Sequence, residues 1–260
     1  FEDNSSYIEC TDDLNRVCPE LENCAGDTSI ALSQIADNQE FFEVKAEYAK
    51  DMVTGFIRLN GATVGCVANR SELYNEEGEK TEEFDGTISA RGARKAAAFV
   101  KFCDAFDIPV LTLTNVTGFK ATLCNEKMMA ASIGEMVRAF ADATVPKVNV
   151  VIGKAYGTAY VAMNSKSVGA DLVYAWDSAE IGMMDASLAA KIMYPGADAA
   201  SLNEKAAEYR NLQSGVESAA ARGYVDTVIA PADTRKYVIG AFEMLFTKRE
   251  DRPAKKHSAV

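Results

Sequence analysis

Hydrophobic and polar residues alternate on both sides of an Asn60-Gly61 pair in the stretch "GFIRLNGATVGCVA". An Asn-Gly pair between two alternating runs is a strong signal for a tight hairpin turn. The pattern therefore predicts two antiparallel strands joined at this pair. The next stretch, "SELYNEEGEKTEEFDG" (71–86), carries many carboxylates, and we expect it to form a solvated loop.

From about Ser89 onward, runs with helical periodicity alternate with short apolar runs. Such alternation is typical of βαβ units, in which helices cover a sheet of parallel strands. The last run, 233–250, predicts an amphipathic helix with Asp233 as its N-cap. In chain order the pattern predicts a helix over 90–106, a strand over 109–116, a helix over 127–143, a strand over 147–153, a turn and short helix over 157–168, short strands over 170–176 and 179–184, a helix from Asp185, and a polar segment before the last helix.

Length and composition agree with a folded domain. The chain has 260 residues, 48% of them hydrophobic, which is enough to bury a substantial core. No apolar run approaches the roughly 20 residues of a transmembrane helix. The first ten residues, "FEDNSSYIEC", are acidic and polar where a signal peptide would be basic and then apolar, so we expect a cytoplasmic protein. Because the chain begins with Phe1 instead of Met, we also expect it to be part of something longer.

The net charge and the types of side chain present limit the partners and reactions that are possible for this protein. A formal net charge of −11 at pH 7 argues against nucleic acid as the main partner, although a local basic patch could hold an anionic coenzyme. The six cysteines include no C-x-x-C pair, so we expect reduced thiols and no metal site. The single histidine, His257, lies in the Lys-rich end of the chain, where we expect a surface position. Most histidine-based chemistry is thereby excluded.

Two of the predicted strands end in glycine turns, at Gly118 in "TLTNVTGFK" and at Gly157 in "VVIGKAYGTAY". Ligands of parallel sheets collect at the carboxyl ends of the strands. Glycine lets the backbone approach a ligand, and the N–H groups that open the next helix have no partner within it. Two such turns facing each other could stabilise an oxygen anion as it forms during a reaction. Each N–H donor would lower the free energy of that state by about 3–4 kcal/mol. They could equally be ordinary strand-to-helix turns, and the spacing alone leaves both interpretations open.

Longer stretches around these turns carry a resemblance. They are "FVKFCDAFDIPVLTLTNVTGF", "ADATVPKVNVVIGKAYGTAY", "VGADLVYAWDSAEIGMM" and "AAARGYVDTVIAPADTRKYVIGAFEML", preceded by "FFEVKAEYAKDMVTGFIRLNG". In this order they resemble the C-terminal half of the biotin-dependent acyl-CoA carboxyltransferases, which serve propionyl-CoA and acetyl-CoA carboxylases and sodium-pumping decarboxylases. The resemblance implies an α/β, crotonase (ClpP)-like fold with repeated ββα units. It divides the chain into an N-terminal arm or linker (1–30), a carboxyltransferase domain (31–250) and a disordered tail (251–260).

In this family the two halves bind different ligands, and this difference determines the function that we expect. Its N-terminal half binds acyl-CoA, its C-terminal half binds biotin or carboxybiotin, and the active site forms between halves of different subunits. The resemblance therefore implies that this chain moves carboxylate between biotin, held on a separate carrier protein, and a short-chain acyl-CoA. Its implied partners are an acyl-CoA-binding N-terminal half or subunit, the biotin carrier protein, and other copies in a homo- or hetero-oligomer. In a decarboxylase complex the chain would lie at the periphery of a membrane.

The resemblance also assigns site residues by position. The backbone groups of Gly118, Phe119, Thr158 and Ala159 match those that polarise the ureido oxygen of biotin. Val161 matches a position that borders the acyl pocket and varies with substrate. We expect Lys154 to be a surface or phosphate-side contact, not a nucleophile. The remaining residues implied to contact biotin or substrate are Gly157, Tyr156, Tyr160 and Asp185, with both tyrosines as pocket walls.

The chain departs from the family pattern at several positions. Asn115 and Thr117 stand in place of aspartate and proline in the usual Asp-Val-Pro-Gly-Phe, and Thr158 stands in place of a glycine. The segment "AASIGE" replaces the usual Arg-His-Gly-Ala-Lys and puts Glu135 near the lysine position. Asp185 occupies the position of a glycine. These departures bear on substrate and direction of reaction more than on fold.

Asp185 supports two alternative functions. In single-domain crotonase-type hydratases, isomerases and decarboxylases, a carboxylate at about this place acts as acid and base on an acyl-CoA. An aspartate that opens "DASLAAKIMY" is equally well explained as a helix N-cap. A third hypothesis is a catalytically silent scaffold subunit, in which Thr158 and Asn115 have closed the pocket.

Overall fold

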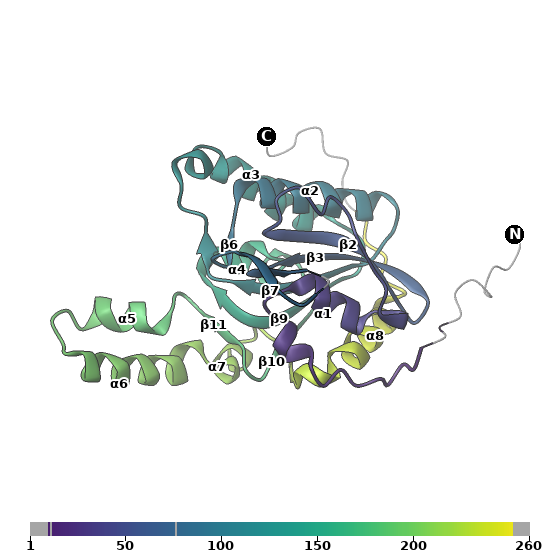
Figure 1. Ribbon diagram of the computed structural model, residues 1–260. Helices are drawn as coiled ribbons and strands as arrows, with labels where there is room; N and C mark the ends of the chain where they lie inside the picture. The colour runs from purple at the N-terminus through teal and green to yellow at the C-terminus, as the bar shows by residue number, and fades with distance from the viewer. Residues whose placement is uncertain (1–9, 11, 76, 252–260) are drawn as a thin grey trace, which may run out of the picture.

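An eight-stranded sheet forms the centre of the protein (Figure 1). The computed structural model describes residues 10, 12–75 and 77–251. The strands of this sheet are β1 (Phe41–Glu43), β2 (Met52–Leu59), β3 (Ala62–Asn69), β7 (Val110–Val116), β9 (Lys147–Tyr156), β10 (Leu172–Trp176), β11 (Glu180–Gly182) and β12 (Thr227–Ile229). Their spatial order is β1-β2-β3-β7-β9-β10-β12, and β11 pairs with the end of β9.

The antiparallel part of the sheet is the hairpin predicted at Asn60-Gly61. Leu59 pairs with Ala62 across the turn, and both central residues have positive φ, 51° at Asn60 and 76° at Gly61. Strands β3, β7, β9, β10 and β12 run parallel to one another. The predicted hairpin and the predicted parallel α/β sheet are therefore both confirmed.

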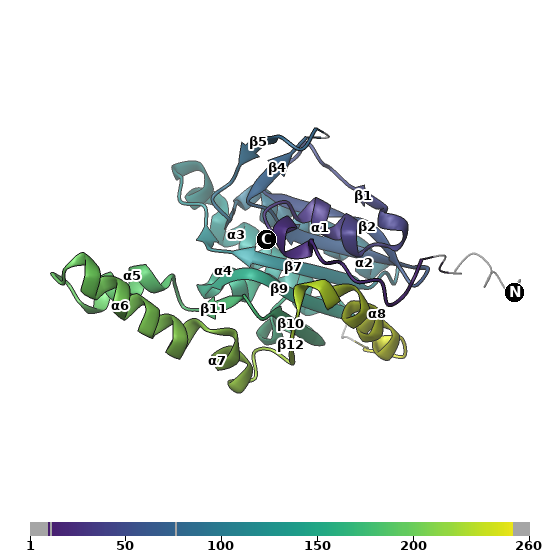
Figure 2. The same ribbon diagram turned by 60° about the horizontal axis from the view of Figure 1, so that its bottom comes forward.

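Helices cover both faces of the sheet (Figures 1 and 2). They are α1 (Thr28–Ile35), α2 (Ala90–Ala105), α3 (Leu123–Asp142), α4 (Gly157–Ala162), α5 (Ala186–Met193), α6 (Ala199–Tyr209), α7 (Val216–Ala221) and α8 (Thr234–Leu245). Helices α2 and α3 lie on one face, and α1 and α8 lie on the other. The predicted helices and strands from Ser89 onward are confirmed, with ends that shift by a few residues.

Alternation along the central strand β9 separates two hydrophobic cores. Val148 and Val150 face the core that contains α1 and α8, whereas Val151 and Ala155 face the core that contains α2 and α3. Successive strand residues point to opposite faces, so a central strand covered on both sides is apolar at nearly every position.

The predicted acidic loop is wrong in part. Residues 72–83 contain a small antiparallel hairpin of β4 (Glu72–Tyr74) and β5 (Lys80–Glu83). Every residue of β5 is exposed, so the segment is solvated as expected. Lys80 lies 3.1 Å from Glu83 and 3.5 Å from Glu72, and these ion pairs offset the repulsion among the carboxylates. A further two-stranded sheet pairs β6 (Thr87–Ile88) with β8 (Gly118–Phe119).

The polar segment after α5 is helical. It forms α6, a π-helical turn over Arg210–Ser214, and α7. Helices α5 and α6 pair with each other and project from the sheet as an arm, which we call the α5–α6 arm (Figures 1 and 2). Asp233 precedes α8 as predicted, but its side chain makes no capping hydrogen bond and instead lies 2.8 Å from Lys236. Asp233 therefore stands where the helix begins, as predicted, but the prediction that its side chain caps the helix is wrong.

The segment before α1 packs on the sheet body instead of extending freely. Cys18 and Leu21 are each 2% exposed and belong to the core under α8. Arg235 of α8 is fully buried and donates to the carbonyl of Ile35 at 2.7 Å and to Asp37 Oδ1 at 2.6 Å. The division into arm, domain and tail stays a prediction, and 252–260, which include His257, lie outside the described residues.

Three further observations bear on the predictions from sequence. All six cysteines are free. Among the described helices, none combines the length and the apolar character needed to span a bilayer. Glu135, which lies near a lysine position of the family pattern, is on the surface of α3 and pairs with Lys101 of α2 at 2.7 Å.

Candidate functional site

The two glycine turns meet at one edge of the sheet. Strands β7 and β9 are parallel neighbours, with Val116 opposite Ala155, so their carboxyl ends lie together. A cavity of about 370 Å³ opens between the turns that follow them. It is lined by Thr117, Gly118, Phe119, Lys154, Tyr156, Gly157, Thr158, Ala159, Met183, Met184, Asp185 and Leu188. We call it the turn cavity.

Both glycines are suited to a close approach by a ligand. Gly157 has a φ of +59°, and a Cβ there would lie 3.1 Å from the carbonyl oxygen of Met183. A side chain at this position would therefore strain the backbone and crowd its neighbour. At Gly118 a Cβ would meet no atom within 4 Å, which leaves the backbone of this turn open.

The start of α4 supplies the hydrogen-bond donors of the turn cavity. Gly157, Thr158 and Ala159 are the first three residues of α4, and their N–H groups have no acceptor within the helix. Tyr156 occupies the N-cap position, and no side chain of the described part of the chain caps this helix end. Donors fixed in this way stabilise negative charge on an oxygen without having to reorient.

Asp185 lines the turn cavity and also caps a helix. Its Oδ1 atom accepts hydrogen bonds from the N–H groups of Ser187 at 2.9 Å and Leu188 at 3.2 Å. The predicted N-cap at the start of α5 is therefore confirmed. Because the carboxylate borders the cavity as well, an acid and base role stays a prediction.

Tyr156 is held by an acidic side chain. Its hydroxyl donates to Glu180 Oε2 at 2.5 Å, and Glu180 Oε1 lies 2.8 Å from Nε of Arg210. Burial, and then the hydrogen bond to Glu180, raise the pKa of Tyr156 well above its usual value. The phenol is therefore neutral at physiological pH. Sequence reasoning missed both Glu180 and Arg210. Glu180 lies within the predicted strand over 179–184, and Arg210 lies in the polar segment for which no element was predicted.

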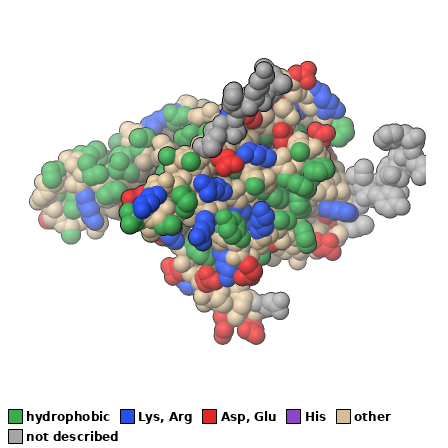
Figure 3. Space-filling view, turned by 90° about the horizontal axis from the view of Figure 1, so that it is seen from above, with side chains coloured by type: hydrophobic (Ala, Val, Ile, Leu, Met, Phe, Trp, Pro, Cys, Tyr) green, Lys and Arg blue, Asp and Glu red, His purple; other side chains and the backbone are tan. Residues whose placement is uncertain are grey.

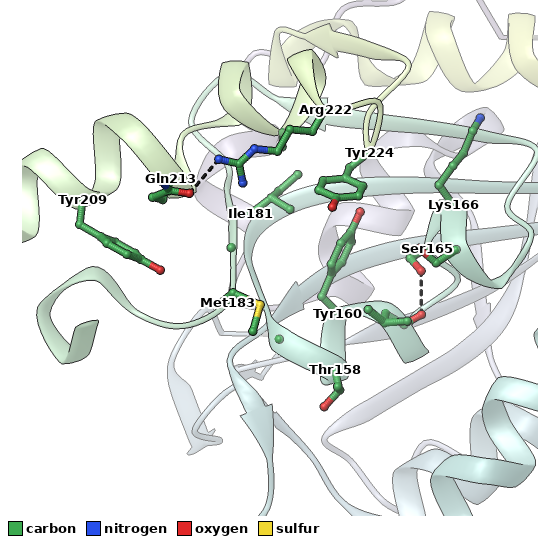
Figure 4. Close-up of a pocket in the computed structure, with 15 residues that line it drawn as sticks. Thr158, Tyr160, Ser165, Lys166, Ile181, Met183, Tyr209, Gln213, Arg222 and Tyr224 are labelled. Atoms are coloured by element: carbon green, nitrogen blue, oxygen red, sulfur yellow. Dashed lines mark hydrogen bonds between the residues drawn. The ribbon is translucent and has the colours of Figure 1, made fainter. Parts of the chain in front are cut away.

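A second cavity of about 280 Å³ lies beyond the start of α4 (Figure 4). It shares Gly157, Thr158 and Met183 with the turn cavity. Its walls are largely apolar and include Val161, which is 36% exposed, and Tyr160, which is 7% exposed. We call it the side cavity.

Tyr160 brings an unpartnered hydroxyl to the side cavity. Burial raises the pKa of Tyr160 to about 12, and its hydroxyl has no hydrogen-bond partner among the described residues. Figure 4 shows this hydroxyl directed toward the ring of Tyr224, and Arg222 nearby donates to Gln213 at 2.7 Å. Neither Tyr156 nor Tyr160 is therefore a base at neutral pH.

The structure thus distributes the predicted site residues over two adjoining spaces. Gly118, Phe119, Tyr156, Ala159 and Asp185 border the turn cavity. Tyr160 and Val161 border the side cavity, and Gly157 with Thr158 separate the two. Lys154 is exposed at the rim of the turn cavity, as expected for a surface contact.

Asn115, one of the departures from the family pattern, forms hydrogen bonds to the backbone near the turns. Its Oδ1 accepts from the N–H of Lys154 at 3.0 Å, and its Nδ2 donates to the carbonyl of Ala25 at 3.2 Å. A Cβ at Gly153 would lie 2.6 Å from the same Oδ1 atom. Asn115 therefore occupies the space that a side chain at position 153 would need, and it does not fill the turn cavity.

Comparisons with known proteins match this arrangement. The family "Carboxyl transferase domain" matches residues 2–260. The "Putative propionyl-CoA carboxylase beta chain" of Bacillus subtilis (strain 168) is 42% identical over 254 residues, which cover 95% of this chain and 48% of that protein. The "Methylmalonyl-CoA carboxyltransferase 12S subunit" of Propionibacterium freudenreichii subsp. shermanii is 43% identical over 238 residues, which cover 89% of this chain and 44% of that protein.

A solved structure carries the same fold. The transcarboxylase 12S crystal structure, described as a hexamer assembly with hydrolysed methylmalonyl-coenzyme A bound, matches with a TM-score of 0.81 and 41% identity. The match covers 96% of this chain and 48% of that one. The predicted crotonase-like α/β fold is therefore confirmed. The chain spans about half the length of the relatives it matches.

Proposed function

The chain belongs to the carboxyl transferase domain family, and from this premise we propose that it is the biotin-binding half of an acyl-CoA carboxyltransferase. The observation that carries the proposal is the turn cavity, where backbone donors at the start of α4 face the open turn at Gly118. Named relatives act on propionyl-CoA or methylmalonyl-CoA, which supports a short acyl-CoA as the second substrate.

The residues present fit a ureido group. Its oxygen is a hydrogen-bond acceptor, and the N–H groups of Thr158 and Ala159 at the start of α4 have no acceptor within the helix. When bound, biotin would supply a ring nitrogen that carries and releases carboxylate. The N–H groups of Phe119, Thr158 and Ala159 would stabilise negative charge on the acceptor oxygen more than the neutral ground state. Gly118 and Gly157 let the backbone come close enough for these contacts.

No side chain of the chain itself needs to act as general base in this proposal. Tyr156 and Tyr160 stay protonated at neutral pH because their pKa values are raised by burial. Asp185 already accepts two helix N–H groups through Oδ1. Val161 would border the acyl group from the side cavity, where its apolar side chain suits an alkyl substituent.

Partners are part of the proposal. The relatives are about twice as long as the matched region, so we expect an acyl-CoA-binding half or subunit and a biotin carrier protein to complete the enzyme. The α5–α6 arm supports such an assembly, because Leu188, Ile192 and Met193 are 51%, 61% and 49% exposed on it. Hydrophobic side chains gather on this projection, at the left of Figure 3. A hexamer, as described for the transcarboxylase 12S structure, and a cytoplasmic location belong to the same proposal.

The first test is ligand-observed NMR on this chain with free biotin in one sample and propionyl-CoA in another. Binding of biotin and not of the thioester is the expected result. Gly118→Val should abolish biotin binding, because Gly118 lines the turn cavity and a Cβ added there meets no protein atom within 4 Å, which leaves the new side chain in space that the ligand would need. Gly134→Ala is the matched control. A Cβ added at Gly134 also meets no atom within 4 Å, and Gly134 lies on α3, away from the cavity. Binding of the thioester alone would contradict the proposal.

A second candidate function rests on Asp185, whose carboxylate borders the turn cavity. An autonomous hydratase, isomerase or decarboxylase would use it on an acyl-CoA. Asp185→Asn separates the two candidates, because asparagine retains the helix cap but cannot exchange a proton. Acyl-CoA turnover by the wild-type chain alone, lost in Asp185→Asn, would favour this second function.

A further inference from the structure

Three side chains connect the α5–α6 arm to the turn at Gly157. Arg210 Nε lies 2.8 Å from Glu180 Oε1, and the Tyr156 hydroxyl donates to Glu180 Oε2 at 2.5 Å. Each oxygen of the Glu180 carboxylate thus holds one partner. Because hydrogen bonds to a charged group are short and directional, the positions of the two partners depend on each other.

The arm end of this connection is packed directly on β11. Arg210 opens the π-helical turn that follows α6, and π-helical turns occur frequently at functional sites. The carbonyl of Arg210 accepts from the N–H of Gly215 at 2.7 Å, and Gly215 forms a β-bridge with Glu180. Ser214 is fully buried beside Gly182, where a Cβ would lie 2.7 Å from Ser214 Oγ. A shift of the arm would therefore move β11 as well.

The other end of the connection is the N-cap of α4. Tyr156 immediately precedes Gly157, and its ring is buried, with 3% of the residue exposed. Because Tyr156 is bonded directly to Gly157, a shift of the Tyr156 backbone would also shift the first N–H groups of α4. Fixing the Tyr156 hydroxyl therefore helps to fix the donors of Thr158 and Ala159.

We propose that Arg210, Glu180 and Tyr156 are positioning residues that make the geometry of the Gly157–Ala159 turn depend on the α5–α6 arm. What the turn binds rests on the proposed function, whereas the coupling between arm and turn does not. A partner that covers the exposed apolar residues of the arm would act on the turn through Arg210. Assembly would in this way align the donors at the site.

The connection can be broken without unfolding the chain. The Arg210 side chain is 47% exposed, and half-exposed ion pairs contribute little to stability. A role limited to stability would therefore leave the turn unchanged when Arg210 is replaced. A positioning role would change the turn while the unfolding transition stays in place.

The test measures the amide chemical shifts of Gly157, Thr158 and Ala159 by NMR in the full chain, because the shift of an amide depends on its orientation and surroundings. In Arg210→Gln and Glu180→Gln we expect these three resonances to move away from their wild-type positions. Arg210→Lys, which retains the charge, should bring them part of the way back. Adding Arg210→Gln to Glu180→Gln should have no further effect, because the first change already breaks the connection.

The matched control is Lys205→Gln. Lys205 lies on α6, shortly before Arg210, and pairs with Glu208 at 2.8 Å, with 37% of its side chain exposed, but this pair does not include Glu180. We expect no change at the turn in this variant. Unchanged amide chemical shifts at the turn in both Arg210→Gln and Glu180→Gln, or an equal change in Lys205→Gln, would overturn the proposal.

A biotin titration of the same variants separates this inference from the proposed function. Altered chemical shifts at the turn with a matching loss of biotin affinity support both. Altered chemical shifts with no biotin binding in any variant, including the wild type, support the coupling and count against the proposed function. Biotin binding that is identical in all variants, together with unchanged chemical shifts, leaves the proposed function standing and overturns the coupling.

Discussion

The sheet body and the α5–α6 arm use their apolar residues in opposite ways. In the body, large side chains such as Phe140 and Trp176 are 0% and 1% exposed. Between α5 and α6 the buried cluster consists of small residues only, namely Ala186, Ala190 and Ala206, and Leu202 and Tyr209 pack against it while partly buried. Other large arm residues such as Ile192 stay exposed. The body is therefore stabilised by its own packing, whereas the arm leaves apolar surface exposed.

The largest expected effect lies in the body. Phe140→Ala should lower the free energy of unfolding by about 3–5 kcal/mol, because it leaves a cavity between α3 and the sheet. Denaturant unfolding followed by circular dichroism measures this loss. A decrease below about 1 kcal/mol would mean that the body is loosely packed, and the contrast with the arm would fail.

A buried cation of the body should give a pH-dependent effect. Lys95 is 2% exposed, its Nζ donates to the carbonyl of Met52 at 2.6 Å, and burial lowers its pKa from 10.5 to about 8. Between pH 8 and 10.5 the unfolded chain binds more protons at this lysine, so its unfavourable contribution to stability fades as pH rises. The full span is about 3 kcal/mol at most.

The measurement for Lys95 compares unfolding free energies of the wild type and Lys95→Met from pH 7 to 10.5. We expect the difference between the two proteins to change in favour of the wild type as pH rises. Because the other titrating groups are common to both proteins, they cancel in this difference. A difference that stays flat across the range would show that Lys95 is not desolvated.

A smaller effect is expected where body and arm meet, at Gly157. Gly157→Ala should cost about 1–2 kcal/mol of stability, because alanine is strained at a φ of +59° and its Cβ would lie 3.1 Å from Met183 O. We expect biotin binding in the NMR titration to be lost as well. Gly240→Ala on α8 is the control, because a Cβ added at Gly240 meets no atom within 4 Å. This change should leave both stability and biotin binding intact.

The smallest effect on stability is expected on the arm. Ile192→Ser should change the free energy of unfolding by no more than about 0.5 kcal/mol, since the residue is already 61% exposed. The same change should weaken association with the proposed acyl-CoA-binding subunit, as measured by sedimentation of the mixed chains. A large loss of stability together with unchanged association would reverse the comparison between arm and body.

Prediction from sequence succeeded where neighbouring residues decide the structure. The turn at Asn60-Gly61 and the cap at Asp185 depend on residues within three positions of each other. The glycines at 118 and 157 marked the strand ends that border the turn cavity, and the resemblance supplied the fold around them.

Prediction failed where distant residues decide the structure. The acidic stretch pairs into a hairpin because Lys80 lies between Glu72 and Glu83, a contact that composition alone does not show. Helix α6 has a weak apolar face, since it packs against α5 and little else. The contact of Arg210 with Glu180 joins residues 30 positions apart in sequence, and no local pattern points to it.

The buried pair of Arg235 with Asp37 has a consequence for how the chain is made. The two residues are 198 positions apart, and Asp37 is 4% exposed in the finished protein. During synthesis the segment around Asp37 leaves the ribosome long before α8 does, so the Arg235 partner of its carboxylate is absent until α8 arrives. Docking of α8 is then the step that forms this buried pair and covers this face of the sheet.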